Sequence, residues 1–321
     1  MAASVTTKPA AGSVLAKLET RLQARAQQAQ TTPAFQSLLK TIRFTSSLRG
    51  TDKVFMLIQY VAKILIWFCR RTAVTSGLAV RIAALAAPIA DTRILLRYAG
   101  LLPLASWAVE VEADALKAKQ TSLPPAASEL SPAEHRRRQF RRLWLNRLQI
   151  LANTLYYPLE HLYWLGAHAV LPIGTPRLNA IGMWSCRFWA AYVVLYFADL
   201  AEQARILRQR QRALKAFTRG AASAPAATLA GPGGVEPHAD AAADASETVV
   251  TAETRLALQQ AARMDLERDH ATWMTQLVVN AAYFPLTLHW SHPVGLLSDL
   301  AVGVCGTVAA VAQLATAWDA T

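Results

Sequence analysis

Residues 300–318, close to the C-terminus, form an apolar segment of 19 residues that contains no Asp, Glu, Lys or Arg. A helix needs about 20 predominantly apolar residues to cross the hydrocarbon core of a bilayer. Gly303 and Gly306 in this segment would let another helix approach closely. The segment therefore predicts a transmembrane helix, and the rest of the chain has to be compatible with a membrane protein.

The composition agrees with a membrane protein that has basic flanks. Of the 321 residues, 53% are hydrophobic, yet 33 Lys and Arg against 21 Asp and Glu give a net charge of +12. Basic segments beside apolar helices explain both numbers at once. A nucleic-acid-binding protein is usually basic but polar, so we expect no nucleic-acid partner. Three cysteines, far apart in the sequence, indicate no disulfide framework.

Residues 133–217 have the pattern of a helical hairpin embedded in a membrane. Two mostly apolar segments are joined by a short turn at 171–176, and arginines gather at both outer ends. The positive-inside rule places both outer ends in the cytosol and the turn deep in, or across, the membrane. Whether the hairpin crosses the bilayer or is half-inserted stays open. The entering basic flank comprises Arg136, Arg137, Arg138, Arg141 and Arg142.

Residues 251–321 repeat this arrangement, with a charged helix, an apolar arm, a turn and the segment 300–318. The entering arms of both hairpins share the motif N-x-x-Y-[YF]-P-L, at 153–159 and 280–286. A proline frees a backbone carbonyl, which packing against a neighbouring helix can satisfy. We therefore predict kinks where the two hairpins pack on each other, with coincidence as the alternative. The kink residues are Tyr157, Pro158, Phe284 and Pro285.

Residues 34–109 are predicted to form amphipathic helices that remodel a membrane. Within them, one narrow apolar stripe at helical spacing comprises Leu78, Ile82, Leu85, Ile89 and Leu96. Arg81 and Arg93 lie at its edges and Arg97 just beyond, from where they could bind anionic headgroups while the stripe enters the acyl boundary. A core-facing helix is the alternative. Pro88 is expected to bend or split the helix.

The remaining segments are predicted to connect these units. Residues 1–33 are expected to form a flexible N-terminal arm with one weak helix at 14–30, or a mitochondrial presequence. Residues 110–132 are polar and contain prolines, which indicates a linker, and 218–250 indicate a disordered Ala/Gly/Pro linker. The predicted fold is an all-α membrane protein, with amphipathic N-terminal helices followed by two membrane-embedded helical hairpins.

No pattern in the sequence indicates catalysis. Phosphate-binding loops, dinucleotide fingerprints and nucleophile elbows are missing, and the seven histidines do not form a metal site by spacing. We therefore expect no enzyme, no cofactor and no metal. Glu160 lies within an apolar run, which makes it a functional-site candidate. An ion pair with Arg187 on the partner arm is the favoured alternative.

Three blocks of the sequence resemble the peroxin-11 family, in the form of its fungal-type members. The block RGTDKVFMLIQYVAKIL at 49–65 is similar to the family's N-terminal signature, which Gly50, Asp52, Lys53, Gln59 and Tyr60 carry. The blocks at 92–102 and 155–165 are similar to the helix that follows and to the stretch ahead of the first hydrophobic region. The likeness covers about 35–217 and the C-terminal segment.

The resemblance implies an integral protein of the peroxisomal membrane, with its termini in the cytosol, that elongates the organelle before fission. It implies association with itself or with other family members, and recruitment of a fission adaptor and a dynamin-related GTPase. It also implies an import receptor for membrane proteins, which would read the basic flank at 136–142. Finally, it favours the interfacial reading of the stripe over the core-facing one.

Two functions follow from these patterns. Membrane remodelling by helix insertion and self-association is favoured. An oligomeric channel for small solutes is the alternative, and it would need a polar path. The polar residues available in the apolar arms are Asn153, Glu160, Arg187, Asn280 and Gln313. The sequence leaves open the topology, the side of the membrane that residues 218–250 face, and the oligomeric state.

Overall fold

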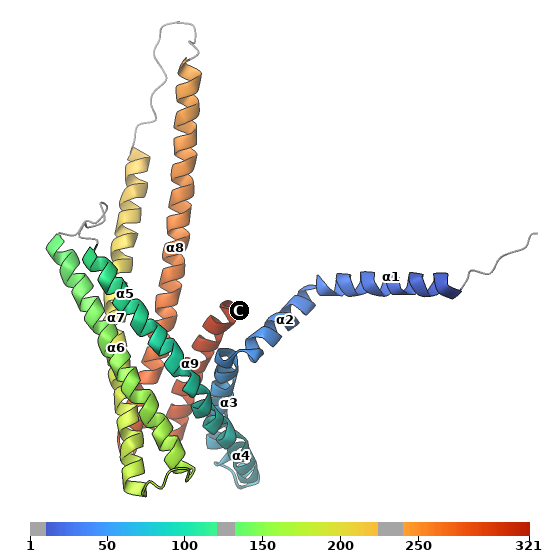
Figure 1. The fold of residues 1–321 in the computed structure, drawn as a ribbon, viewed down its shortest axis with the longest axis vertical. Helices are drawn as coiled ribbons and strands as arrows, with labels where there is room; N and C mark the ends of the chain where they lie inside the picture. The colour runs from blue at the N-terminus through green and yellow to red at the C-terminus, as the bar shows by residue number, and fades with distance from the viewer. Residues whose placement is uncertain (1–10, 121–131, 224–239) are drawn as a thin grey trace, which may run out of the picture.

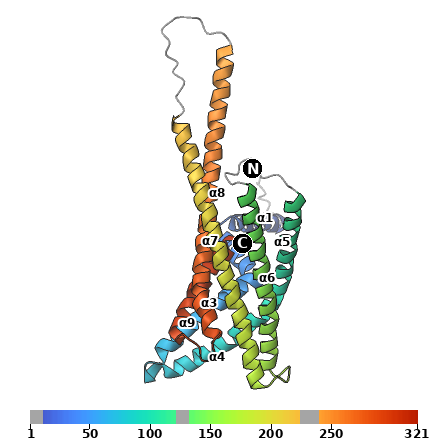
Figure 2. The ribbon, with the colours of Figure 1, turned by 90° about the vertical axis from the view of Figure 1, so that its left-hand side faces the viewer.

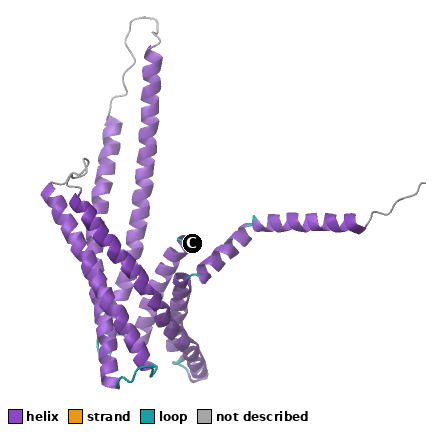
Figure 3. Cartoon of the chain, in the orientation of Figure 1, coloured by secondary structure: helices purple, strands orange, loops and turns teal. Residues whose placement is uncertain are grey.

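The computed structural model describes residues 11–120, 132–223 and 240–321, which form helices and no strand (Figure 3). The all-α prediction is confirmed. The elements are α1 (Ala11–Gln30), α2 (Pro33–Ser46), α3 (Leu48–Cys69), α4 (Ala73–Leu96), the 3-10 helix η1 (Arg97–Gly100), α5 (Leu101–Gln120), α6 (Pro132–Ala167), α7 (Thr175–Ser223), α8 (Asp240–Trp290) and α9 (Asp299–Asp319).

The helices α3 to α9 form one bundle, from which α1 and α2 project to one side (Figure 1). The helices α6 and α7 form one hairpin and α8 and α9 a second, and α7 lies between α6 and α8. The α6–α7 connection lies at 168–174, close to the turn expected at 171–176. Both long helices α7 and α8 extend well beyond the rest of the bundle (Figure 1).

Three helical stretches in the described residues are long and apolar enough to cross a membrane: Ala73–Lys117, Thr175–Thr218 and Asp299–Asp319. The last contains the segment predicted from the sequence to be transmembrane. Because α9 has 21 residues, at 1.5 Å per residue it is about 31 Å long, close to the roughly 30 Å of a hydrocarbon core. The helix α9 is therefore long enough to cross a membrane.

Close packing of α9 against α3 depends on glycine. A Cβ on Gly306 would lie 2.1 Å from the Tyr60 ring, and one on Gly303 would lie 2.7 Å from the Ile64 side chain. These small residues let the two helices approach, as the sequence predicted. The core between α3, α8 and α9 comprises Met56, Tyr60, Ala282, Leu286, Val302, Ala309 and Ala310.

Two predicted linkers are partly helical. The helix α5 continues to Gln120, and α7 and α8 reach Ser223 and Asp240, so described parts of 110–132 and 218–250 are not linker. Residues 110–120 are rich in Ala, Glu and Lys, and the helical parts of 218–250 are rich in Ala. These residues have high helix propensity, which here outweighs the polar composition. The rest of both predicted linkers (121–131 and 224–239) lies outside the described residues, as do 1–10 of the predicted arm.

The helix α4 differs from its prediction. Its exposed apolar side chains are not confined to one side, because Val80 is 70% exposed and Leu78 on the other side is 49% exposed. It is also not split at Pro88, one of the two outcomes expected there, and the Pro88 carbonyl accepts a hydrogen bond of 2.8 Å from the Thr92 hydroxyl. The expected single stripe is therefore wrong as a description of this helix.

Candidate functional site

A partly open cavity of about 1530 Å³ lies between α3, α4, η1, α5, α6, α7, α8 and α9. Its wall is mixed, with aromatic rings such as Tyr60 and Trp189 beside charged side chains. Apart from the exposed Arg49 and from Asp91, which contacts His168, the charged residues that line it are Asp52, Lys53, Arg93, Arg97 and Glu160, which we call the inner wall. They come from α3, from α4 and η1, and from α6, so the site depends on how α4 and η1 lie against the two neighbouring helices.

The first charged group joins α4 to α3. Arg93 is only 6% exposed, and its Nε donates to Asp52 Oδ1 at 2.9 Å. Lys53 Nζ donates to the other oxygen of Asp52 at 2.8 Å. Arg93 Nη1 also donates to Gln59 Oε1 at 2.7 Å. Asp52 and Gln59 are seven residues apart and thus share one face of α3, which lets one arginine reach both.

The second charged group joins η1 to α6. Arg97 donates twice to Glu160, from Nε to Oε2 at 2.8 Å and from Nη2 to Oε1 at 2.6 Å. The Tyr156 hydroxyl donates to the same carboxylate at 2.9 Å. Such a two-point arginine–carboxylate pair fixes both position and orientation.

The family-like signature forms part of this wall and of the corner before it. Asp52, Lys53, Gln59 and Tyr60 all line the cavity. Gly50 lies at the α2–α3 corner, where a Cβ would lie 2.0 Å from the carbonyl oxygen of Phe44. The helix α3 begins at Leu48 with Ser47 as its N-cap, which leaves the Asp52 carboxylate available for Arg93.

Three expectations about charged residues are corrected. Arg93 and Arg97 pair with carboxylates inside the bundle, so they are not placed to bind headgroups, whereas Arg81 is exposed. Glu160 pairs with Arg97 and not with Arg187. Arg187 instead lies over the Trp184 ring, 4.8 Å from its centroid. The electrostatic attraction between an arginine and a nearby carboxylate is strong in a low-dielectric interior. It is therefore more favourable than extension of the arginine to a distant interface.

The stripe residues lie on α4 with unequal exposure. Leu85 is 62% exposed and Leu78 49% exposed, while Ile82, Ile89 and Leu96 are partly covered by the bundle. Figure 2 shows that α4 crosses one end of the bundle. Its C-terminal part lies near the first hairpin turn, through Asp91–His168 at 2.8 Å, and the α3–α4 corner that precedes it lies near the second, through Arg70–Asp299 at 3.7 Å.

The two kink motifs both pack on α7: for the α8 motif this is packing between the two hairpins, as expected, whereas for the α6 motif it is packing within the first hairpin. Their equivalent tyrosines, Tyr156 and Tyr283, both pack on Trp189, with ring centroids 6.2 Å and 5.2 Å away. Tyr157 lies against Gly100 and Phe284 against Phe197. The helices α6 and α8 are continuous through Pro158 and Pro285. The motifs therefore pack against α7, which separates the arms that carry them.

The structure extends the motif by one residue that sequence reasoning missed. Asn153 and Asn280 each donate from the side-chain amide to the backbone oxygen four residues earlier, at 3.1 Å and 2.8 Å. That earlier residue is glutamine in both copies, Gln149 and Gln276. The equal spacing of glutamine and asparagine is visible in the sequence and would have strengthened the case for a duplication.

A hydrogen-bonded histidine connects the first turn to α4. His168 Nε2 lies 2.8 Å from Asp91 Oδ2, and its Nδ1 lies 2.9 Å from the Trp164 carbonyl oxygen. Because both ring nitrogens face acceptors, only the protonated ring can donate to both. The Trp164 carbonyl, followed by the Asp91 carboxylate, raises the pKa of His168 above its ordinary value.

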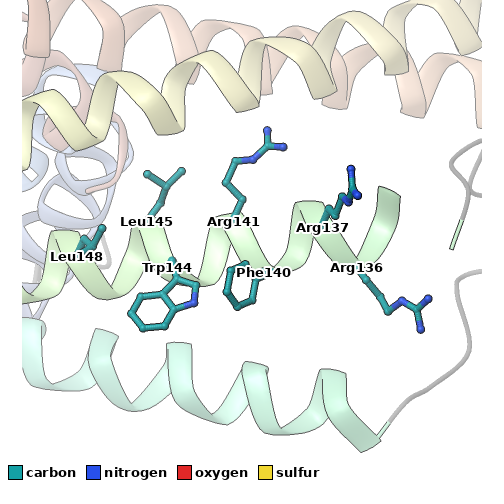
Figure 4. A pocket seen from close by; sticks show the side chains of 7 residues that line it. All are labelled: Arg136, Arg137, Phe140, Arg141, Trp144, Leu145 and Leu148. Atoms are coloured by element: carbon teal, nitrogen blue, oxygen red, sulfur yellow. The ribbon is translucent and has the colours of Figure 1, made fainter. Parts of the chain in front are cut away.

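Three arginines of the basic flank, Arg136, Arg137 and Arg141, line an open pocket of about 670 Å³ on α6 (Figure 4). Its lining comprises Arg136, Arg137, Phe140, Arg141, Trp144, Leu145 and Leu148. Part of the flank has a structural role, because Arg138 and Arg141 contact Glu202 of α7 at 2.9 Å and 3.4 Å. Glu202 is 6% exposed, so these contacts neutralise a buried carboxylate.

A family model described as peroxisomal biogenesis factor 11 matches residues 38–110 and 128–318 of the chain. No curated protein and no solved structure matches the chain. The matched region contains both hairpins, α3, α4 and every charged residue of the cavity wall. The chain therefore belongs to the peroxisomal biogenesis factor 11 family, a family of peroxisomal membrane proteins that act in peroxisome proliferation and division.

Proposed function

We propose that this protein elongates the peroxisomal membrane before fission by inserting apolar helix faces beside an anchored bundle, and that many copies self-associate to do so. The observation that carries the proposal is the position of α2. Its Phe44 ring packs on Trp318 at the far end of α9, with centroids 5.5 Å apart. If α9 spans the bilayer, α2 lies at the interface opposite to the hairpin turns. The positive-inside rule makes that interface the cytosolic one.

The chemistry of α2 suits that interface. Its uncovered face carries Leu38 and Ile42, which are 53% and 49% exposed. Lys40 and Arg43 lie outside this face, on the polar side of the helix. Each buried Leu or Ile contributes about 1.5–3 kcal/mol, and a basic residue near an anionic surface about 1 kcal/mol. Insertion of α2 adds area to the cytosolic leaflet, which favours outward curvature.

The role predicted for the stripe in α4 changes accordingly. Because α4 lies at the end of the bundle with the hairpin turns, we propose that Leu78 and Leu85 contact the lumenal half of the bilayer. There they anchor the bundle, and α2 supplies the asymmetry between the leaflets. This assignment is compatible with termini in the cytosol.

Reconstitution of the full-length protein into anionic liposomes tests the proposal. Leu38→Glu with Ile42→Glu should abolish tubulation while the protein stays resistant to carbonate extraction. Ser37→Glu with Thr41→Glu adds the same charges to the polar side of α2, where both residues are exposed, and should leave tubulation largely intact. Undiminished tubulation by the first variant would refute the role of α2.

We also propose a place for the fission partners that the resemblance implies. The parts of α7 and α8 that extend beyond the bundle (Figure 1) would lie in the cytosol. They are accessible there to a fission adaptor and a dynamin-related GTPase. Charge reversal at the exposed residues Arg208 and Arg212 should weaken co-precipitation of these partners without changing membrane integration. Unchanged co-precipitation would move their site elsewhere.

The second candidate function is a solute channel, and the cavity favours it. Asn153, Glu160, Asn280 and Gln313 line the cavity, whereas Arg187 does not. Four of the five polar residues that a channel would need thus face one space. Conductance of the protein in planar bilayers, lowered by Asn280→Leu, would support this function. Bilayers that stay non-conducting would exclude it.

A further inference from the structure

We propose that the cavity binds a single-chain amphipathic anion, with its carboxylate or phosphate head at Lys53 and its tail along the aromatic wall. This inference concerns a site within one chain and does not depend on membrane remodelling. It also differs from a channel, because a bound molecule occupies the cavity in a saturable way.

The charge balance of the inner wall calls for an anion. Lys53, Arg93 and Arg97 carry three positive charges, and Asp52 and Glu160 carry two negative charges. Glu160 is committed to Arg97 by two hydrogen bonds. Asp52 is shared between Arg93 and Lys53. One positive charge thus remains uncompensated in the interior, where an unpaired charge is costly.

Lys53 is the residue best placed to receive the anion. Its side chain is 18% exposed, and within the described residues its one hydrogen-bond partner is Asp52. An ammonium group has three donors, so two remain for a ligand. Arg93 is less suitable, because it already donates to both Asp52 and Gln59.

The remainder of the wall suits an apolar chain. Tyr156, Tyr157, Tyr283, Trp189 and Trp107 contribute rings from four helices. The volume of about 1530 Å³ exceeds the roughly 300–1,000 Å³ of an ordinary small-molecule pocket, so there is room for an elongated ligand. A small inorganic anion would leave this surface uncovered. A neutral chain would leave the positive charge unmatched.

Photolabelling of the purified full-length protein in neutral nanodiscs tests the proposal. A long-chain fatty acid that carries a photoreactive diazirine should label cavity residues saturably, and its methyl ester should label them about tenfold more weakly, since a charge-assisted hydrogen bond is lost. Equal labelling by acid and ester would overturn the proposal with no variant needed. Label found only on the outer surface of α4 would overturn it as well.

Variants locate the head group. Lys53→Met should weaken labelling by the acid about tenfold, and Lys53→Arg should restore it. Lys63→Met is the matched control, because Lys63 belongs to the same helix and does not line the cavity. Unchanged affinity in Lys53→Met would contradict the assignment of the head group.

Competition identifies the source of the anion. A single-chain lysophosphatidic acid that displaces the probe at lower concentration than an unlabelled fatty acid assigns a phosphate head, and the opposite order assigns a carboxylate. Inorganic phosphate should not compete at comparable concentrations. Competition by phosphate alone would show a site for free anions and overturn the requirement for a tail.

Discussion

Arg97 and Glu160 form a two-point ion pair that joins η1 to α6, with N–O distances of 2.6 Å and 2.8 Å. Together with the contact of Arg93 and Asp52, this pair fixes the C-terminal end of α4 to two different helices. The N-terminal part of α4 exposes its apolar side chains. The helix is therefore anchored at one end by charges and available to lipid at the other.

We expect Glu160→Gln to destabilise the bundle, because it leaves the Arg97 charge without a counterion in a poorly solvated place. The free energy of unfolding should fall by about 2 kcal/mol, less than for a fully buried pair since Arg97 is 27% exposed. Thermal unfolding in detergent measures this change. Glu267→Gln, which breaks the exposed Arg263–Glu267 pair, should cost at most about 0.5 kcal/mol. Equal effects of the two changes would contradict a structural role for Glu160.

We expect Gly306→Ala to separate α3 from α9. The new Cβ would overlap the Tyr60 ring, so overpacking should lower stability by about 1–3 kcal/mol. Disulfide crosslinking between cysteines introduced on the two helices reports their separation. Gly77→Ala is the control, because nothing lies within 4 Å of its Cβ position, and the better helix propensity of Ala should stabilise α4 slightly. An unaltered crosslinking pattern in Gly306→Ala would argue against close packing of α3 and α9.

The hairpins could be predicted from the sequence because their signals are local. Apolar length, a short turn and flanking arginines are all read within some tens of residues, and they placed the α6–α7 turn and α9 close to where the structure has them. The family likeness located the residues of the cavity wall in α3. The likeness did not indicate that these residues line a cavity together with residues of other helices.

The partners of the charged residues could not be predicted because they are distant in sequence. Arg93 lies 41 residues from Asp52, and Arg97 lies 63 residues from Glu160. A helical pattern fixes which side chains share a face, but not which helix that face meets. For the same reason the pattern suggested Arg187 as the partner of Glu160. The helix boundaries predicted in the Ala-rich segments were wrong, because composition alone does not distinguish an exposed helix from a linker.

We expect the contact between the first turn and α4 to depend on pH. The folded state raises the pKa of His168, through the Trp164 carbonyl and then Asp91. The stabilising contact is therefore fully present below the ordinary pKa of about 6.5, and it is lost as the pH rises through the raised folded value. An NMR titration of labelled His168 measures this pKa. Asp91→Asn should move it part of the way back, since the Trp164 carbonyl remains. A pKa unaffected by Asp91→Asn would show that the two side chains are not in contact.

The basic flank at 136–142 should contain two separable functions. Arg138 and Arg141 contact the buried Glu202, so replacing both by Ala should loosen the α6–α7 hairpin. Arg136, Arg137 and Arg142 are exposed. We propose that Arg136 and Arg137, which line the apolar pocket of Figure 4, are read together with Arg142 by the import receptor for peroxisomal membrane proteins, because an apolar surface flanked by arginines offers both charge and hydrophobic contact.

Replacing Arg136, Arg137 and Arg142 by Ala should therefore leave a stable protein in the cytosol or in mitochondria. Replacing Arg138 and Arg141 should yield a less stable protein that still reaches peroxisomes. Fluorescence microscopy of tagged full-length variants, combined with thermal unfolding in detergent, separates the two outcomes. Peroxisomal localisation of the triple variant at normal stability would exclude these arginines from the targeting signal. The receptor would then have to read the apolar helix alone.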